Sequence, residues 1–271
     1  MRVRGLGDLA ARSGGALLLV TLYVFLYAPI AYVIYTSFQK DLNWPFPPSW
    51  TLTHYADLAA DRTYQEGLVN SILLGLGSAV ICTLFATLGS IAVLKYRSRW
   101  RALMVIIYLC PLFVADLLVG ISNLLFNRQI LNLPGNMGSA MIGNAVHCTS
   151  FAFLIMLAQL SRYDWRLDDA AMVFGARPLR CFFEITLPLI WPAMFGAFVV
   201  SFILAFNNLE ISFYNLGAIP TLPTIAWGSL RFGLGGELFA LAALVNGVVL
   251  AAFTVMYLLM RYRIVSFGHR E

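Results

Sequence analysis

A charged segment punctuated by Gly and Pro stands between two long apolar stretches of the chain. It runs from Asp168 to Pro188 and reads DDAAMVFGARPLRCFFEITLP. Acids favour the N-terminal end of a helix, Gly175 can end that helix with a positive φ, and Pro178 suits the first turn of the next helix. The segment predicts a helix, a turn and a second helix, with an apolar side able to dock into a groove on a partner protein. A plain solvated loop is the alternative.

Asp116 is the one acid that lies well inside a long apolar stretch. A carboxylate placed in lipid costs about 3 kcal/mol on insertion scales, so we expect its side chain to face the interior of the protein. There it would either line a solute pathway and attract a cation, or pair with a structural donor, and the residue types leave both open. His147, in the next apolar stretch, is more typical of a hydrogen bond between helices than of a ligand contact.

Three further polar residues, Asn207, Asn208 and Glu210, end another apolar stretch. They are candidates for lining a solute pathway, and a helix C-cap is the alternative for the two amides. The sequence from Asn207 to Glu237 is too broken by Gly and Pro to span a membrane, yet too apolar for a free loop. It predicts a partly buried, cavity-lining segment or a short interfacial helix.

The spacings that membrane enzymes require are absent from the sequence. The three histidines are isolated from one another, without an H-E-x-x-H pattern, and no G-x-S-x-G or G-x4-G-K-[ST] occurs. The four cysteines show no C-x-x-C spacing and are best interpreted as small buried hydrophobes. We therefore expect no catalytic, cofactor-binding or metal-binding residues, and any ATP hydrolysis must come from another polypeptide.

Long apolar stretches must position these residues. The chain has 271 residues, of which 11% are charged, against roughly 25% in soluble domains. A helix crosses a bilayer with about 20 mainly apolar residues, and the short alternating strands of a barrel are absent. The sequence predicts an all-α, polytopic membrane protein that forms a single domain over 1–271. The six expected transmembrane helices are at about 16–38, 67–94, 102–126, 139–160, 185–206 and 238–260.

The basic residues fall mainly on one side of this arrangement. With six spans, one membrane face receives both termini, the turn near Lys95 and the segment 161–184, and it holds 14 of the 18 Lys and Arg residues. The positive-inside rule then places both termini and the segment 161–184 in the cytoplasm. The net charge of +5 reflects topology rather than nucleic-acid binding.

The spacing inside the cytoplasmic segment resembles the signature of the membrane subunits of ABC importers, E-A-A-x3-G-x9-I-x-L-P. Every position is filled in register, with Asp169 in place of the Glu. The resemblance implies that the first helix is a coupling helix seated in a cleft of a cytoplasmic ATP-binding subunit, and that motion passes through Pro188 into the membrane. The implied ATPase-coupling set is Asp168, Asp169, Ala170, Ala171, Gly175, Ile185, Leu187 and Pro188.

The resemblance extends over nearly the whole chain, toward the spermidine/putrescine-type permeases. FLYAPIAYVIYTSF, NSILLGLGSAV, PLFVADLLVGIS and ITLPLIWPAMFGAFVVSFILAF carry it. It implies the type I ABC importer permease fold and alternating access in the bacterial inner membrane. The implied partners are a dimer of ATP-binding subunits, a second permease subunit in a heterodimer, and an extracytoplasmic solute-binding protein. ATP and Mg²⁺ would be used by the partner, and this chain would be neither an enzyme nor a cofactor carrier.

The chain departs from the polyamine permeases at one place. Those proteins typically carry paired acids where this sequence has Asn207 and Asn208, ahead of a stretch like SFYNLG. Carboxylates give charge-assisted bonds to ammonium groups, whereas amides bond without net attraction. The range of expected solutes therefore extends from polyamines to related amine-bearing or zwitterionic compounds, such as opine-like molecules. Asp116, Asn207, Asn208 and Glu210 form the expected substrate pathway.

An ion-coupled secondary transporter of a small polar solute is the competing class. Such transporters show internal inverted repeats and several ionisable residues near the middle of the membrane. The sequence has one such residue, Asp116, and no repeat is visible.

Overall fold

The computed structural model describes residues 6–40, 48–96, 99–231, 233 and 235–261. Within these residues the regular elements are helical, and a lone antiparallel bridge joins Gln39 to Trp50. The expected all-α class is confirmed. Several basic residues used in the topology prediction lie outside the described residues: Arg2, Arg4, Arg97, Arg263 and Arg270.

The chain divides into two compact units, each with its own contacts. Residues 1–61 and 229–252 form the first, which contains α1 (Leu6–Ser37), α2 (Thr53–Ala60) and most of α12 (Gly236–Arg261). Residues 62–228 and 253–271 form the second, which contains the elements from α3 to α10 and most of α11 (Leu222–Leu230). The residues that the sequence singled out between Asp116 and Glu210 all belong to the second unit.

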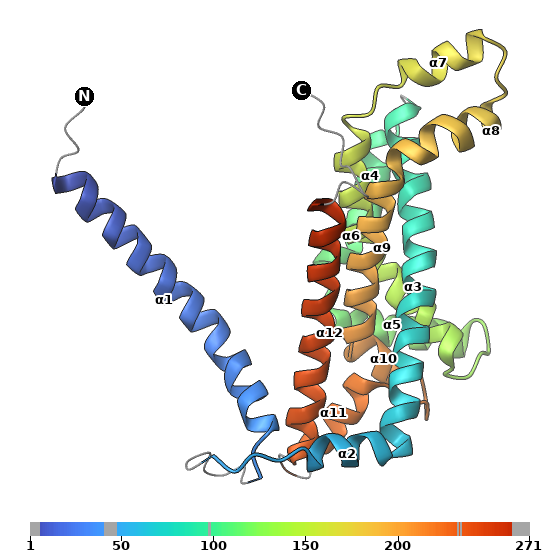
Figure 1. The fold of residues 1–271 in the computed structure, drawn as a ribbon. Helices are drawn as coiled ribbons and strands as arrows, with labels where there is room; N and C mark the ends of the chain where they lie inside the picture. Colours follow the sequence, from blue (N-terminus) through green and yellow to red (C-terminus); the bar gives the residue numbers. More distant parts are fainter. Residues whose placement is uncertain (1–5, 41–47, 97–98, 232, 234, 262–271) are drawn as a thin grey trace. The chain divides into compact units, whose positions relative to one another are not determined.

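Three long helices build the second unit, and they run side by side in Figure 1. They are α3 (Arg62–Lys95), α6 (Met137–Leu160) and α9 (Leu187–Asn207). Small side chains line their contacts, which lets the backbones approach closely, as membrane helices do in the absence of a strong hydrophobic drive. The buried residues of this core include Cys82, Ala86, Ala145, Cys148, Ala152, Ala193 and Ala197, with Phe153 and Met156 filling the larger spaces.

The stretch expected to form one helix at 102–126 is broken into pieces. It forms α4 (Arg101–Leu109), a 3-10 turn η1 (Cys110–Phe113) and α5 (Asp116–Gln129), with a bend of 105° between its two halves. Val114 and Ala115 are extended at the bend. Pro111 stands at the start of the 3-10 turn, where it lacks the N–H that a continuing helix needs. The sequence predicted one helix over 102–126 and did not reveal this break, because a bent span and an unbroken one have the same apolar composition.

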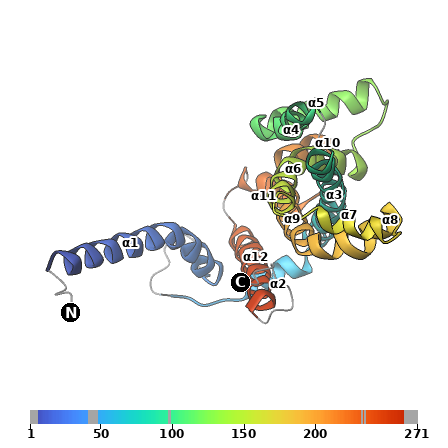
Figure 2. The same cartoon turned by 90° about the horizontal axis from the view of Figure 1, so that it is seen from above.

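Four of the described helices are long and apolar enough to cross a membrane, or five if the bent pair counts as one span. The four are Gly15–Ser37, Arg62–Lys95, Met137–Leu160 and Pro178–Asn207. Gly236–Leu250 is a shorter apolar helix at the position of the last expected span. The short helices α7 (Arg166–Val173), α8 (Pro178–Cys181) and α10 (Glu210–Asn215) connect the long ones. Viewed from above, α4 and α5 lie on one side of α6, and α7 and α8 on the other (Figure 2).

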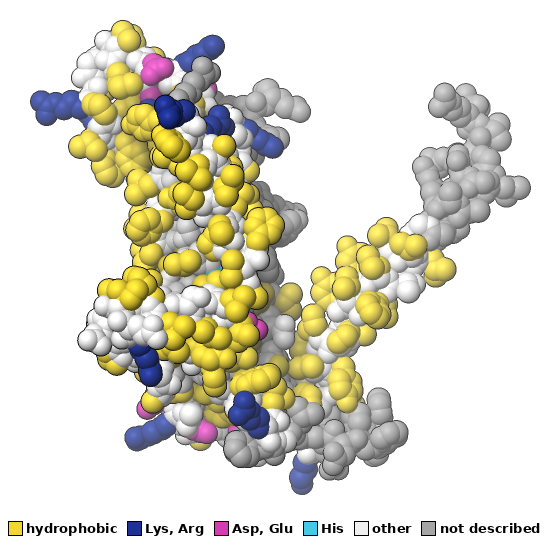
Figure 3. All heavy atoms as spheres, turned by 180° about the vertical axis from the view of Figure 1, so that it is seen from behind, with side chains coloured by type: hydrophobic (Ala, Val, Ile, Leu, Met, Phe, Trp, Pro, Cys, Tyr) yellow, Lys and Arg dark blue, Asp and Glu magenta, His cyan; other side chains and the backbone are white. Residues whose placement is uncertain are grey.

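On the face drawn in Figure 3, hydrophobic side chains cover the middle of the bundle and Lys and Arg gather toward its ends. This pattern suits helices whose middles face lipid and whose ends face water. The buried environment expected for the cysteines holds for Cys82, Cys148 and Cys181, whereas Cys110 in η1 is exposed.

Candidate coupling segment and solute pathway

The segment that opened the sequence analysis folds as predicted, into helix, turn and helix. Asp168 and Asp169 lie in the first turn of α7, where the helix dipole favours acids. Gly175 has φ +88° and follows that helix, and its N–H donates to the carbonyl of Met172 at 3.0 Å. Pro178 then begins α8. A side chain at position 175 would meet nothing within 4 Å, so the conformation rather than space calls for glycine there.

This turn lies at one end of the bundle (Figure 1), and large apolar side chains around it are exposed. The side chains of Val173, Phe174 and Leu179 are 84%, 92% and 74% exposed. A plain solvated loop would not present three large apolar side chains together, and exposed apolar patches rimmed by charge mark interaction sites. Of the residues of the signature, Asp169 and Ala170 are exposed beside this surface and Ala171 is half-buried.

The second half of the signature leads into the long helix. Ile185 is half-buried within η2, a single π-helical turn (Phe182–Thr186). Leu187 begins α9 directly after the π-helical turn and is half-buried, and Pro188 is the next residue. The stretch from Pro178 to Asn207 is thus one continuous candidate span.

Asp168 differs from its neighbours because its side chain points inward and is fully buried. It accepts hydrogen bonds from Lys95, Tyr163 and Thr186, none of which the sequence reasoning had selected. Burial alone would raise the pKa of Asp168, but these hydrogen bonds hold it below its usual value. Burial likewise raises the pKa of Tyr163 to about 12, so the phenol stays a donor. Asp168 is therefore placed to anchor α7, and it cannot contact a partner from the exposed surface.

Asp116, at the start of α5, lies next to Asn208, at the end of α9. The amide nitrogen of Asn208 donates to Oδ2 of Asp116 at 2.7 Å, and its oxygen accepts from the backbone N–H of Ile211 at 2.8 Å. Nδ1 of His147 lies 3.1 Å from Oδ1 of Asp116 but makes no hydrogen bond to any described residue. About a third of the Asp116 side chain remains exposed, so its carboxylate can still receive a further donor.

The structure does not bring all four expected pathway residues together. Asn207 is exposed and donates to the carbonyl of Ile203 in its own helix at 3.0 Å. Glu210 is exposed at the first turn of α10. Asp116 also does not lie in mid-helix as expected. It occupies the first turn of α5, directly after the bend. Only Asp116 and Asn208 form a contact, with His147 beside them.

The segment after Asn207 is partly buried, as predicted, and a cluster of amides holds it. The cluster consists of Asn123 and Asn127 in α5, Ser139 in α6 and Asn215 in α10. Asn215 Oδ1 accepts from Asn123 at 2.7 Å and from the Ser139 hydroxyl at 3.3 Å, and its amide nitrogen donates to the carbonyls of Gly120 and Ile211. Asn127 donates to the Ser139 hydroxyl at 2.6 Å. These bonds fix α5, α6 and α10 as one rigid support for Asp116.

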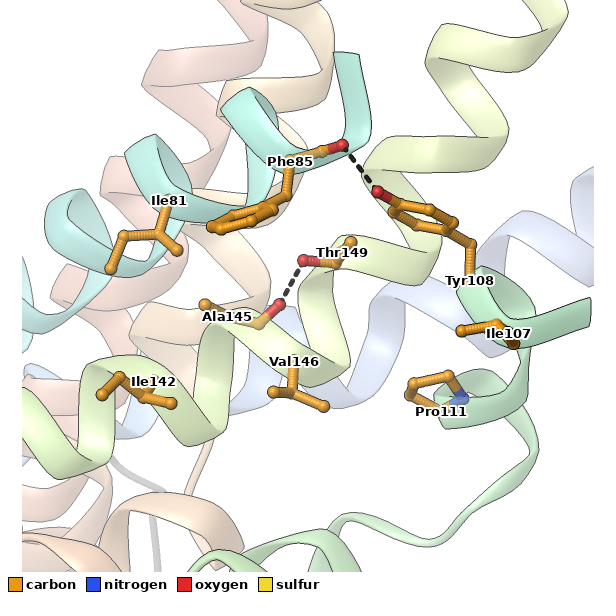
Figure 4. Close-up of a pocket in the computed structure, with 9 residues that line it drawn as sticks. All are labelled: Ile81, Phe85, Ile107, Tyr108, Pro111, Ile142, Ala145, Val146 and Thr149. Atoms are coloured by element: carbon orange, nitrogen blue, oxygen red, sulfur yellow. Dashed lines mark hydrogen bonds between the residues drawn. The ribbon is translucent and has the colours of Figure 1, made fainter. Parts of the chain in front are cut away.

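A separate hollow of about 480 Å³ lies among α3, α4, η1 and α6 (Figure 4). Apolar side chains dominate its walls, and none of the lining residues is charged. The hydroxyls of Tyr108 and Thr149 already donate to the carbonyls of Phe85 and Ala145. Such a surface is unsuited to a polar or cationic solute. Asp116 and Asn208, two of the residues expected to line the pathway, lie elsewhere, at the junction of α5 and α9.

Comparison with known proteins shows relatives of one kind over most of the chain. The putrescine transport system permease protein PotI of Escherichia coli K12 is 28% identical over 247 residues, or 88% of each chain. The spermidine/putrescine transport system permease protein PotC of the same strain is 26% identical and spans 83% of this chain and 86% of its own. A putative 2-aminoethylphosphonate transport system permease protein, PhnV of Salmonella typhimurium, is 23% identical over 93% of this chain and 94% of its own. No protein-family model matches the chain.

Solved structures share the fold at lower identity. A bacterial ABC transporter that imports the acidic polysaccharide alginate matches with a TM-score of 0.70 at 17% identity, over 99% of this chain and 100% of its own. The methionine ABC transporter MetNI matches with a TM-score of 0.58 at 15% identity, over 74% of this chain and 94% of its own.

The likeness covers sequence and fold across most of the chain, so it concerns the whole molecule rather than one motif. Permease subunits of ABC importers carry no cofactor and are not enzymes, since a separate subunit hydrolyses ATP. The chain is thus related to the spermidine/putrescine permeases PotI and PotC, which are similar to it over most of its length, and it shares the fold of ABC importer permease subunits.

Proposed function

We propose that this chain is one of two permease subunits that carry a small amine-bearing solute across the bacterial inner membrane by alternating access. Six transmembrane helices in a type I arrangement, with α4 to α5 as one bent span and α12 as the last, place both termini in the cytoplasm. A dimer of ATP-binding subunits supplies the energy, and an extracytoplasmic binding protein delivers the solute.

The observation that carries the proposal is the exposed apolar turn at the basic end of the bundle. Exposure to water of three large apolar side chains, Val173, Phe174 and Leu179, is unfavourable in an isolated subunit. A groove on a cytoplasmic partner would bury them. Asp169, Ala170 and Gly175, which match the importer signature, lie around the same turn. Coupling by this segment fits both the signature and its exposure.

The proposed solute class is supported by one chemical feature that the solutes named for the relatives share. Putrescine, spermidine and 2-aminoethylphosphonate, named for PotI, PotC and PhnV, all carry a primary amine. The Asp116 carboxylate can accept a hydrogen bond from an ammonium group, because a third of its side chain is exposed. Asn208 adjoins it, and Glu210 stands exposed one helix turn beyond.

The proposal is tested by purifying the complex that forms around a tagged copy of this chain and reconstituting it with its binding protein. ATP hydrolysis is then measured with putrescine, spermidine, 2-aminoethylphosphonate and an alginate oligosaccharide. We expect one or more of the amines to stimulate hydrolysis and to be taken up, and the oligosaccharide to do neither. Stimulation by the oligosaccharide alone would refute the proposed solute class. Failure of any ATP-binding subunit to co-purify would refute the coupling role.

A further inference from the structure

One acid of the coupling segment does not share the exposure of the residues around it. Asp168 is fully buried, whereas the adjacent Asp169 and Ala170 are exposed. A buried carboxylate is costly unless it is paired and hydrogen-bonded. The hydrogen-bond donors to Asp168 therefore show which parts of the protein hold α7 in place.

Each donor to the Asp168 carboxylate comes from a different element of the second unit. Nζ of Lys95, the last residue of α3, lies 2.6 Å from Oδ2. The hydroxyl of Tyr163, just after α6, donates to Oδ1 at 2.8 Å. The hydroxyl of Thr186, at the end of η2, donates to the same oxygen at 3.0 Å. One carboxylate thus holds α7 to the ends of three long helices.

The two ends of this anchor differ in burial. Lys95 keeps 31% of its side chain exposed and places its ammonium 5.3 Å from the ring centre of Trp165, so it is partly solvated. Asp168 and Thr186 are buried, and the thiol of Cys181 approaches the backbone carbonyl of Asp168 at 3.8 Å. The attachment to Thr186 is consequently shielded from water, where hydrogen bonds are stronger.

Thr186 ends a π-helical turn that leads directly into α9. Such turns are rare and recur at functional positions. The covalent route from α7 to α9 passes through the exposed turn at Gly175 and Pro178, and then through α8 and η2. The buried hydrogen bond between Asp168 and Thr186 is a shorter route by which a displacement of α7 can reach α9.

We propose that Asp168 is the positioning residue that makes α7 move as one body with the cytoplasmic ends of α3 and α9. A displacement of α7 by the ATP-binding subunit then reaches both spanning helices at once, rather than through the chain at Gly175 alone. This inference rests on the proposed function, because it presumes that a partner moves α7.

The test uses the purified complex and a readout that needs no known solute. Spin labels at Leu189→Cys in the first turn of α9 and Leu125→Cys in α5, both exposed positions, report the distance between the proposed moving body and a helix outside it, in a Cys110→Ser background. The distance is measured without nucleotide and after trapping with ATP, Mg²⁺ and vanadate. If the unsubstituted complex shows no change, the proposed function fails. If it shows a change, the variants decide the role of Asp168.

Asp168→Asn and Lys95→Met should lose most of the distance change while the complex still assembles and traps nucleotide. Lys95→Arg, which keeps the ion pair, should retain it. Glu184→Gln is the matched control, because it removes an exposed partner of Arg180 on the same segment. Should Asp168→Asn not assemble, Thr186→Val and Tyr163→Phe each remove one bond and should each reduce the change. A full change in Asp168→Asn, or in both of these milder variants, overturns the inference.

Discussion

The amide of Asn208 donates a 2.7 Å hydrogen bond to Oδ2 of Asp116, and so joins the end of α9 to the start of α5. Both residues stand at helix ends rather than within helices, one after a 105° bend and the other where α9 stops. The carboxylate keeps its other oxygen near His147 and part of its surface open. In the proposed solute pathway, this carboxylate would be an acceptor that is already oriented toward a donor on the solute.

Asp116→Asn should weaken solute recognition without disturbing assembly. The amide keeps the size of the side chain but loses the charge, and a hydrogen bond to a charged group contributes about 1.5–3 kcal/mol. We expect KM for amine uptake to rise roughly tenfold or more, while basal ATP hydrolysis stays unchanged. Asp57→Asn, at an exposed acid of α2, is the matched control. Equal KM values in Asp116→Asn and the unsubstituted protein would exclude Asp116 from the pathway.

Asn208→Asp should shift preference toward diamines. It places a second carboxylate against Asp116, where two like charges repel unless a dication lies between them or one is protonated. The ratio of putrescine uptake to uptake of a monoamine of similar length should rise several-fold. Competition between the two labelled amines measures it. An unchanged ratio would contradict a solute site at this junction.

Substitution at Gly175 should separate ATP hydrolysis from transport. Gly175→Ala forces a side chain into φ +88° and costs about 1–2 kcal/mol locally, and Gly175→Pro also removes the N–H that bonds to Met172. Both proteins should insert into the membrane, with uptake reduced in the first and lost in the second, while hydrolysis by the complex continues. Gly196→Ala, inside α9 with open space around it, serves as the control. Normal uptake by Gly175→Pro would sink the coupling assignment.

The Asp168 anchor should give the protein a defined pH dependence. Its folded pKa lies below the unfolded value of about 3.9, so the stability that it contributes is present above that value and is lost as the pH falls through the folded pKa. In detergent, the difference in Tm between the unsubstituted protein and Asp168→Asn should be constant from pH 8 to about pH 5. It should shrink below about pH 4. A difference that instead vanishes on raising the pH would contradict this ionised, hydrogen-bonded state.

Substitutions in the amide cluster around Asn215 should destabilise the folded protein more than substitutions at most other polar residues. Asn215→Leu removes four hydrogen bonds and leaves the Ser139 hydroxyl without its acceptor, while Asn123 keeps its bond to the Ser139 carbonyl. We expect this change to destabilise the protein by about 2–4 kcal/mol. Asn207→Leu, at an exposed amide that bonds only within its own helix, should have a small effect. Thermal unfolding in detergent compares the two. Similar Tm values would show that the cluster contributes little.

Local signals were enough to predict the coupling segment. Gly175 and Pro178 set the turn through their own backbone preferences, and Asp168 and Asp169 mark the helix start within a few residues. The bend at Pro111 to Ala115 escaped prediction because a broken helix and a straight one have the same apolar composition.

Contacts between distant residues could not be predicted at all. Asp168 was grouped with the exposed coupling residues, yet its partner Lys95 lies 73 positions away and buries it. Asn215 and Asn123 are 92 positions apart. The presence of an amide in an apolar stretch does not indicate which residue it will bond to. The signal available for Lys95 was its position at the end of a predicted span. Lysine at such a position commonly extends its ammonium to water, so nothing in the sequence indicated a buried partner.

The most direct test of the central claim is uptake of labelled amine by proteoliposomes that contain the full complex, with either ATP inside or an imposed ion gradient. If this chain is driven through α7 by a separate ATPase, uptake requires ATP and the binding protein and persists when ionophores abolish every gradient. Uptake by this chain alone, driven by a proton or sodium gradient without ATP, would contradict the account.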